Sequence, residues 1–281
     1  MPEIITNPDE RLIAEALGLY NTVFPKRKTS LARFRRRLML DSGASLPIER
    51  AEGRLIGFAV CYRDGLLMLA VEQSFRGRGI GSALLRECEA LASPFGQLRL
   101  GYAASGSYLF CGAPVEANGF FDHRGYSNDW TACDCLLTVE DFTPSEHECD
   151  ASVSIGTRTD GERDEAFALA NRVSHWGDFW AKTDELIVAR SDGRLVGGVM
   201  LEDGCLFEGS IERSCTLGCL GVDADYRRRG IAASLCHELA NRAKSRGYRS
   251  IFIGYTHISD WYGRLGAKIF ASYRFGVKRL S

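Results

Sequence analysis

The stretch LGCLGVDADYRRRGIA, residues 217–232, decides the fold. An apolar, strand-like segment leads through a short acidic turn into a cluster of arginine and glycine, and an amphipathic helix follows. The stretch LLMLAVEQSFRGRGIG, residues 66–81, has the same order. When Arg76 is aligned with Arg227, the repeat length is 227 minus 76, or 151 residues, which is the size of a domain. The sequence therefore predicts that one whole fold occurs twice.

The segments in front of each copy also agree. Two strands joined by a tight turn are expected at 47–51 and 54–62 around Glu52-Gly53, and again at 186–190 and 194–201 around Asp192-Gly193. The helix after each turn has an apolar face at the helical period, formed by Leu84, Leu85, Cys88 and Leu91 in the first copy and by Leu235, Cys236, Leu239 and Ala243 in the second.

A further strand follows each helix, at 97–102 and at 249–255, and then a short helix and a final pair of strands. The polar stretch 143–150 lies between the two copies and is the natural linker. We therefore expect one domain at 1–143 and a second at 150–281.

Composition limits the class of protein. A chain of 281 residues with 45% hydrophobic and 25% charged residues is typical of two globular domains in solution. Its net charge of -1 provides no field that would attract nucleic acid or an anionic membrane, so we expect neither as a partner. The basic run Arg33-Phe34-Arg35-Arg36-Arg37 is interpreted as one solvated helix face.

Neither a targeting signal nor a metal site is apparent. Residues 1–10 lack the basic and apolar parts of a secretory signal, and the longest apolar stretch, near 65–71, is too short to span a bilayer, so we expect a cytoplasmic protein. The ten cysteines lie scattered in apolar surroundings and predict reduced core residues. The pairs Cys133/Cys135 and Cys215/Cys219 lack zinc-site spacing, so no metal is expected.

The turn between strand and helix suits an anion. Glycine lets the backbone approach a ligand, and the first amides of the helix point at that ligand with the favourable end of the helix dipole. A pyrophosphate fits such a turn, and arginine adds positive charge beside it. The spacing is neither that of an ATP-binding Walker loop nor that of a dinucleotide-binding Gly-x-Gly-x-x-Gly loop.

These turns resemble the pyrophosphate loop of the GCN5-related N-acetyltransferase (GNAT) family, Arg/Gln-x-x-Gly-x-Gly/Ala. Arg76, Gly79 and Gly81 match it in the first copy, and Arg227, Gly230 and Ala232 match it in the second. The resemblance implies an α/β (α+β) protein with two tandem GNAT folds. Each would be a mixed, mostly antiparallel sheet flanked by helices, with a V-shaped splay between strands 4 and 5. The arrangement is similar to that of tandem members such as mycothiol synthase.

The resemblance also implies acetyl-CoA as cosubstrate, held by the glycine turn and by backbone groups of the strand before it. The acyl-CoA-binding residues that it implies are Leu69, Ala70, Val71, Arg76, Gly77, Arg78, Gly79, Ile80 and Gly81 in the first copy, and Leu220, Gly221, Val222, Arg227, Arg228, Arg229, Gly230, Ile231 and Ala232 in the second.

The catalytic acid of the family is usually a tyrosine on the helix after the fifth strand, and Tyr262 matches that position. Phe121 stands there in the first copy and has no proton to give, so we expect the first domain to be non-catalytic. The asparagine that the family usually has seven residues before the tyrosine is Pro114 in one copy and Tyr255 in the other.

The expected activity is transfer of an acetyl group from acetyl-CoA to a primary amine by direct attack in a ternary complex. The alternative is an acyl-CoA-binding regulatory or assembly module without turnover. Glu208, Glu212 and His257 are candidate general bases, and residues 174–180 are expected at the acceptor pocket. A small-molecule amine and a peptide amine both remain open as acceptors, as do a monomer and a homodimer.

Overall fold

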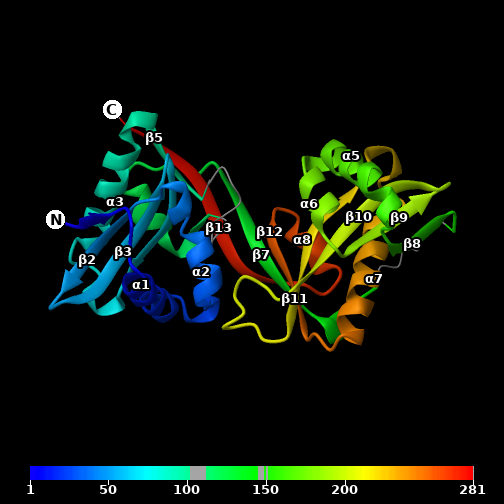
Figure 1. Cartoon of the computed structure of the whole chain (residues 1–281), viewed down its shortest axis with the longest axis horizontal. Helices are drawn as coiled ribbons and strands as arrows, with labels where there is room; N and C mark the ends of the chain where they lie inside the picture. The colour runs from blue at the N-terminus through cyan, green and yellow to red at the C-terminus, as the bar shows by residue number, and fades with distance from the viewer. Residues whose placement is uncertain (102–111, 145–148, 150, 281) are drawn as a thin grey trace. The chain divides into compact units, whose positions relative to one another are not determined.

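The computed structural model describes residues 1–101, 112–144, 149 and 151–280, and Figure 1 shows their path. The chain divides into two compact units. The first contains Met1–Cys133, Leu206–Ser210 and Ala271–Ser281, and the second contains Asp134–Cys205 and Ile211–Phe270. Tyr102, at the expected end of a strand, and residues 145–148 and 150 of the expected linker lie outside the described residues.

The first unit is a mixed sheet with helices packed on it. Its strands lie in the order β1 (Glu3–Ile5), β2 (Leu46–Ala51), β3 (Arg54–Tyr62), β4 (Gly65–Val71), β5 (Gln97–Leu100) and β13 (Lys268–Arg279), with β6 (Ala113–Pro114) also beside β13. Its helices are α1 (Glu10–Val23), α2 (Leu31–Arg37), α3 (Ile80–Ala92) and α4 (Asn118–Asp122). The β4–β5 pair is parallel, whereas β1–β2, β2–β3, β3–β4 and β5–β13 are antiparallel.

The second unit repeats this plan. Its strands lie in the order β7 (Trp130–Thr138), β12 (Ser250–Thr256), β11 (Ser214–Val222), β10 (Arg194–Asp203), β9 (Leu186–Ser191) and β8 (Val153–Thr157). Its helices are α5 (Arg163–Ser174), α6 (Gly177–Lys182), α7 (Ile231–Ser245) and α8 (Ser259–Gly263). Again one pair, β11–β12, is parallel, while β8 to β11 are antiparallel. Two mixed, mostly antiparallel sheets flanked by helices confirm the predicted fold class.

The final strands of the two repeats are exchanged between the units. The strand β13, at the end of the chain, pairs with β5 in the first unit, from Gly276 opposite Leu100 to Arg279 opposite Gln97. Residues 134–138 of β7 belong to the second unit, where the Asp134 carboxylate accepts the backbone N–H of Tyr255 at 2.8 Å. Each unit therefore takes its last strand from the repeat that forms most of the other unit.

Both predicted hairpins are confirmed. The central residues of the two turns all have positive φ, with Glu52 at 52° and Gly53 at 76° in the first and Asp192 at 49° and Gly193 at 76° in the second. Positive φ at both positions defines the type I′ turn, whose twist matches that of the strands it joins. Each turn fixes the register of its hairpin, because the two residues that flank it face each other directly. These are Ala51 and Arg54 in the first hairpin and Ser191 and Arg194 in the second.

Helices cover both faces of the second sheet. A Cβ added to Gly198 of β10 would lie 3.0 Å from the Trp180 ring of α6, and one added to the preceding Gly197 would lie 3.3 Å from Leu235 of α7. Since neighbouring strand residues point to opposite faces, α6 covers one face and α7 the other. In α7 the side chains predicted to form the apolar face, from Leu235 to Ala243, are buried.

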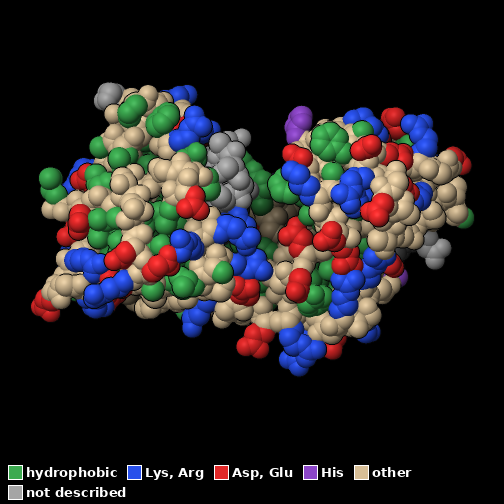
Figure 2. Space-filling view, in the orientation of Figure 1, with side chains coloured by type: hydrophobic (Ala, Val, Ile, Leu, Met, Phe, Trp, Pro, Cys, Tyr) green, Lys and Arg blue, Asp and Glu red, His purple; other side chains and the backbone are tan. Residues whose placement is uncertain are grey.

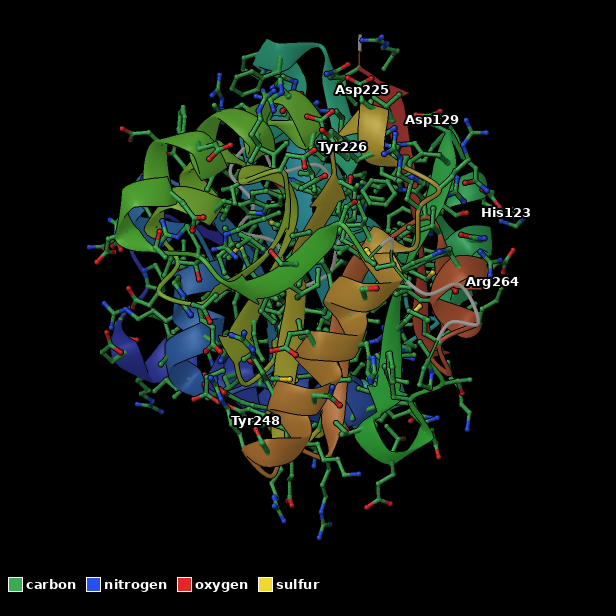
Figure 3. The ribbon with its side chains drawn as sticks, turned by 90° about the vertical axis from the view of Figure 1, so that its right-hand side faces the viewer. His123, Asp129, Asp225, Tyr226, Tyr248 and Arg264 are labelled. Atoms are coloured by element: carbon green, nitrogen blue, oxygen red, sulfur yellow. The ribbon has the colours of Figure 1, made fainter. Side chains whose placement is uncertain are left out.

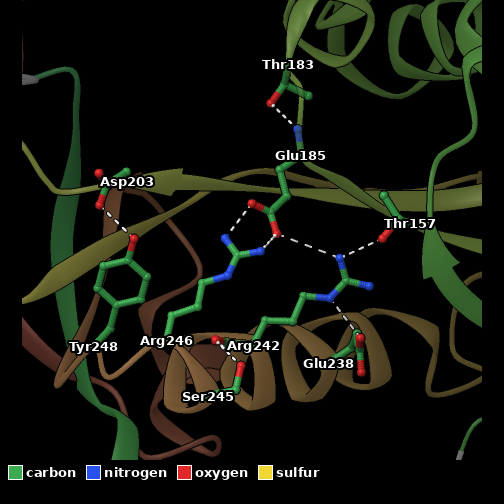
Figure 4. Close-up of polar contacts among 9 residues, drawn as sticks. All are labelled: Thr157, Thr183, Glu185, Asp203, Glu238, Arg242, Ser245, Arg246 and Tyr248. Carbon is green, nitrogen blue, oxygen red and sulfur yellow. Dashed lines mark hydrogen bonds and ion pairs between the residues drawn. The ribbon is translucent and has the colours of Figure 1, made fainter.

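Polar contacts anchor the C-terminal end of α7 to the sheet (Figure 4). Arg246 donates at 2.5 Å to Glu185, which immediately precedes β9, and Arg242 donates at 2.8 Å to Thr157 of β8. Within the helix, Arg242 also donates to Glu238 at 2.8 Å. These contacts hold the far end of the helix whose N-terminus forms the second glycine turn. In Figure 3, Asp225 and Tyr226 lie at the glycine-turn end of this helix and Tyr248 at the other end.

The remaining global features concern charge and cysteine. Basic and acidic side chains are interspersed over the face shown in Figure 2, in keeping with the balanced net charge. Nine of the ten cysteines lie in the described residues as free thiols, seven of them buried. Within those residues no group of three His, Cys, Asp or Glu side chains could hold a metal ion. A helix long and apolar enough to cross a membrane does not occur in the described part of the chain.

Candidate active site

The two glycine turns have the same backbone conformation. Gly79 and Gly230 are the N-cap residues of α3 and α7, with φ of 82° and 75°. Two residues earlier, Gly77 and Arg228 also have positive φ, at 75° and 62°. Left-handed backbone is easy for glycine and costly for other residues, so the sequence places glycine where the turn requires it. Arg228 adopts the same conformation without that freedom.

An arginine side chain in each turn stabilises it by a hydrogen bond to the backbone. The Nε of Arg76 donates to the carbonyl of Val71 at 3.0 Å, and the Nε of Arg227 donates to the carbonyl of Val222 at 3.2 Å. Each bond ties the turn to the end of the strand before it. The first arginine of the motif therefore supports the turn, while its charge stays near the helix N-terminus. The guanidinium of Arg229 lies 5.1 Å from the centre of the Tyr226 ring, a distance at which a cation is attracted to an aromatic face.

Each helix presents free amides at this end. The first bond within α7 runs from the N–H of Ser234 to the carbonyl of Gly230, and in α3 the matching bond runs from Ala83 to Gly79. Both N-caps are glycines, which have no side chain to cap the helix. The amides of residues 231–233 and 80–82 are thus available to an anion, which the helix dipole attracts. Both turns therefore present helix amides in a position to bind an anion.

A β-bulge distinguishes the strand before the second turn. Gly221 lies opposite Gly198 and Gly218 opposite Met200, so Cys219 and Leu220 together oppose a single residue of β10. Cys219 takes a φ of 47°, which is unusual for a residue other than glycine. A bulge interrupts the ladder and leaves backbone groups unpaired with the neighbouring strand. Sequence reasoning missed it, although Gly218 and Gly221 on either side were a usable signal.

The first unit has a regular strand at the same place. In β4 the matching residues Leu69 and Met68 pair one to one with Ala59 and Val60. The irregularity of this strand occurs at Leu67, between Leu66 and Met68. Consequently the two turns are alike, but the strands before them differ. The strand before the second turn is bulged at residues 219–220, whereas the strand before the first turn is regular at the matching residues 68–69.

An aromatic ring packs beside the first glycine turn. A Cβ added to Gly81 would lie 3.4 Å from the ring of Phe120, so this ring covers the first turn of α3. The guanidinium of Arg124 stacks 3.8 Å from the centre of that ring and donates to the Ser82 hydroxyl. These contacts fill the space beside the first glycine turn with the protein's own side chains.

The central strands separate after Thr216, before the bulge is reached. β11 and β12 are paired from Ser214–Ser250 to Thr216–Phe252, and in the described residues no later pair joins them. In the first unit, β4 and β5 are paired only at Gly65–Arg99 and Leu66–Leu100. This is the predicted V-shaped splay, and in the second unit it opens at the strand that carries the bulge.

Tyr262 lies on α8 and is buried near Cys236 of α7 and Cys135 of β7. Burial raises the pKa of its hydroxyl above the ordinary value, and the neighbouring thiols of Cys236 and Cys135 raise it further. A raised pKa keeps the hydroxyl protonated at neutral pH, which is what a proton donor to a leaving thiolate needs. In the first unit the matching Phe121 is buried among Phe120 and Tyr126.

The other predicted residues have different surroundings. Glu208 lies in the first unit, where Arg33 donates to it at 2.8 Å. Burial acts to raise the pKa of its carboxyl, but the hydrogen bonds from Ser30 and Arg33 outweigh burial, so the pKa is lowered. Glu212 and His257 are exposed. Residues 174–180 join α5 to α6, and Trp180 there is fully buried and donates its indole N–H to the carbonyl of Cys219 at 2.9 Å. Tyr255, at the expected asparagine position, has an exposed side chain.

The Cys219 side chain sits in the bulge but is a poor nucleophile. Its burial, reinforced by the nearby Glu202 carboxylate, raises the pKa of the thiol to about 12. The thiol is therefore protonated at neutral pH, whereas a nucleophilic cysteine acts as the thiolate.

Comparison with known families agrees with this geometry. Residues 154–264 match the Acetyltransferase (GNAT) family, and residues 47–128 match the Acetyltransferase (GNAT) domain. The chain belongs to the GNAT family. It is a tandem GNAT protein. Both of its domains belong to this family of acetyltransferase enzymes. No curated protein sequence matches it.

Solved structures share the tandem fold. A GCN5-related glucosamine N-acetyltransferase region of a fungal multi-domain protein has a TM-score of 0.81 at 20% identity, covering 99% of this chain and 38% of that chain. A GCN5-related N-acetyltransferase from Sphaerobacter thermophilus has a TM-score of 0.75 at 18% identity, covering 99% and 96%. A tandem GNAT protein from the clavulanic acid biosynthesis pathway has a TM-score of 0.68 at 14% identity, covering 100% and 99%. This chain thus spans less than half of the fungal protein.

Proposed function

We propose that this tandem GNAT protein transfers an acetyl group from acetyl-CoA to a primary amine, and that the second domain holds the working site. The proposal rests on three features that occur together in the second domain and not in the first. This domain combines a glycine turn with free helix amides, a strand that is bulged at Cys219 and splayed from β12, and a buried, protonated Tyr262.

Each part has a role in the reaction. The amides of residues 231–233 bind the pyrophosphate of acetyl-CoA, and the arginines at 227–229 add positive charge. The pantetheine arm runs back along residues 222–220, which brings the thioester carbonyl to the bulge. Unpaired backbone groups there stabilise the negative charge that develops on the carbonyl oxygen. The amine attacks the carbonyl carbon directly, and Tyr262 gives its proton to the departing thiolate.

The first domain has a structural role in this proposal. Its turn has the correct backbone, but the Phe120 ring covers Gly81, the strand is regular at Leu69, and Phe121 replaces the tyrosine. We therefore place the acyl-CoA site at 220–232 and expect the matching residues 69–81 to bind the ligand weakly. The repeats at 1–143 and 150–281 remain our division of the chain. Free, buried thiols favour a reducing compartment such as the cytoplasm.

Calorimetry with acetyl-CoA and an assay of CoA release across a panel of amines test the proposal together. We expect one micromolar site per chain, or about -8 kcal/mol, and release of CoA with at least one amine. Glucosamine belongs in the panel because the fungal protein region of the same fold is a glucosamine N-acetyltransferase. Binding without turnover on any amine would favour the acyl-CoA-binding module instead, and no binding at millimolar ligand would overturn both functions.

A further inference from the structure

Glu202, near the end of β10, places a carboxylate beside the bulge. Its partner across the ladder is Thr216 of β11. A Cβ added to Gly218 would lie 3.1 Å from the Oε1 atom of Glu202. The carboxylate therefore lies over the backbone of Gly218, immediately next to Cys219, and its effect on the pKa of that thiol agrees with this position. A side chain at residue 218 would crowd this carboxylate.

The side of the sheet on which Glu202 lies follows from its neighbours. Met200, two residues earlier, packs with Trp180, Trp176 and Cys219 in one core cluster. Alternate residues of a strand share a face, so Glu202 belongs to the face covered by α5 and α6. Asp203, the next residue along the strand, belongs to the opposite face, where it accepts a hydrogen bond of 2.7 Å from the Tyr248 hydroxyl.

The position matters because of where the thioester would lie. In the function proposed above, the arm of acetyl-CoA ends at the bulge, and Gly218 is the next residue of β11 beyond Cys219. An amine that approaches the carbonyl from the face covered by α5 and α6 would pass the Glu202 carboxylate. That carboxylate is exposed, so an acceptor could reach it.

We propose that Glu202 is the general base that deprotonates the acceptor ammonium; this inference rests on the proposed acetyl transfer. The ammonium first gives one proton to the Glu202 carboxylate and becomes a neutral amine. Its nitrogen then forms the C–N bond, the C–S bond breaks, and the thiolate takes the proton of Tyr262. The second proton lost by the nitrogen restores Tyr262 through solvent. Glu202 releases its own proton to solvent, so the products are the amide, CoA thiol and one free proton.

Several charged groups on the neighbouring elements have partners of their own. The titratable group that faces it from β11 is the protonated thiol of Cys219. On the covering helices, Arg172 pairs with Asp223 at 3.0 Å and Lys182 with Asp178 at 3.2 Å, and the exposed His175 ends α5. Glu185, which immediately precedes β9, pairs with Arg246 at 2.5 Å.

The test is Glu202→Gln, which keeps the size of the side chain and removes its basicity. We expect kcat/KM for the amine to fall about a hundredfold at pH 7, with an unchanged Kd for acetyl-CoA. The deficit should shrink as the pH approaches the ionisation of the amine, and it should be small for an arylamine, which is already neutral at pH 7. Asp203→Asn is the matched control, because it neutralises the adjacent carboxylate on the other face and should leave the rate unchanged.

A second variant moves the carboxylate without removing it. Gly218→Ala introduces the Cβ that would lie 3.1 Å from Oε1 of Glu202, and we expect an intermediate loss of rate with the same dependence on amine basicity. If Glu202→Gln is as active as the wild type, or if its deficit is equal for alkylamines and the arylamine at every pH, Glu202 is not the base. If the wild type itself acetylates no amine, the proposed function fails instead.

Discussion

Trp180 donates its indole N–H to the carbonyl of Cys219 across 2.9 Å, and so ties a fully buried helix residue to the bulge of β11. The Trp180 ring also packs over Gly198, where no side chain intervenes. One residue therefore holds both strands that form the bulge. The bulge is thus fixed by the helix that covers this face, which means that its geometry is set before any ligand binds.

Replacing Trp180 by phenylalanine should loosen the bulge. The change removes the bond to Cys219 and part of the ring, and we expect it to lower the free energy of unfolding by about 1–3 kcal/mol. Because small displacements of catalytic groups are costly, kcat should fall about tenfold to a hundredfold. Urea unfolding and steady-state kinetics measure the two effects. A stable variant with unchanged kcat would show that the bulge does not depend on this bond.

Tyr262→Phe should lower kcat by about ten- to a thousandfold and leave the Kd for acetyl-CoA unchanged. The hydroxyl acts when the thiolate leaves, so its loss removes roughly 1.4 to 4 kcal/mol of transition-state stabilisation, while the buried ring keeps its packing. Because burial raises the pKa of Tyr262, its deprotonation should not define a limb of the rate profile below about pH 9.

Tyr248→Phe is the control for this experiment. Tyr248 lies at the other end of α7, where its hydroxyl donates to Asp203 at 2.7 Å, and its loss should not change kcat (Figure 3). A Tyr262→Phe variant that turns over as fast as the wild type would assign the proton transfer to water or to another side chain.

Glu162 should contribute a pH-dependent part of the stability. Its carboxylate accepts two bonds of 2.6 Å from Arg190 and one of 2.7 Å from the N–H of Thr159, and Arg190 above all lowers the pKa of Glu162 to about 2. In the unfolded chain a glutamate has a pKa of about 4.3. A lowered pKa in the folded state stabilises the fold above the unfolded value, and this stabilisation is lost as the pH falls toward about 2.

Glu162→Gln should therefore lower the free energy of unfolding by about 1 kcal/mol at pH 7, a modest value because the pair is partly exposed. The difference from the wild type should shrink between about pH 5 and pH 2. Denaturant titrations at several pH values measure it. Asp160→Asn is the control, since Asp160 is almost fully exposed and pairs with Arg163 only at 3.5 Å. A difference that does not change with pH would contradict the ionic origin.

Local signals in the sequence were sufficient for the hairpins and the glycine turns. Glu52-Gly53 and Asp192-Gly193 need positive φ at both residues, and the structure has it. Gly79 and Gly230 likewise begin their helices as predicted. In these cases the residue itself determines the conformation, so a short window of sequence is enough.

Tertiary context decides the remaining features. The exchange of β7 and β13 could not be predicted, because it depends on pairings between residues far apart in the sequence, such as Gly276 with Leu100. Glu202 was missed for a similar reason. Its position beside Gly218 depends on the register of β10 against β11, and that register is shifted by the bulge. A carboxylate at the end of a strand has no local mark of catalysis.

The most direct test of the central claim compares the same substitution in the two glycine turns. Gly79 and Gly230 begin α3 and α7 with φ of 82° and 75°, so valine at either position should strain the backbone to a similar degree. The measurement is kcat/KM for acetyl transfer, with urea unfolding of both variants as control. The account predicts that Gly230→Val abolishes transfer and Gly79→Val retains most of it. Loss of transfer in Gly79→Val with activity kept in Gly230→Val would place the working site in the first domain and contradict the account.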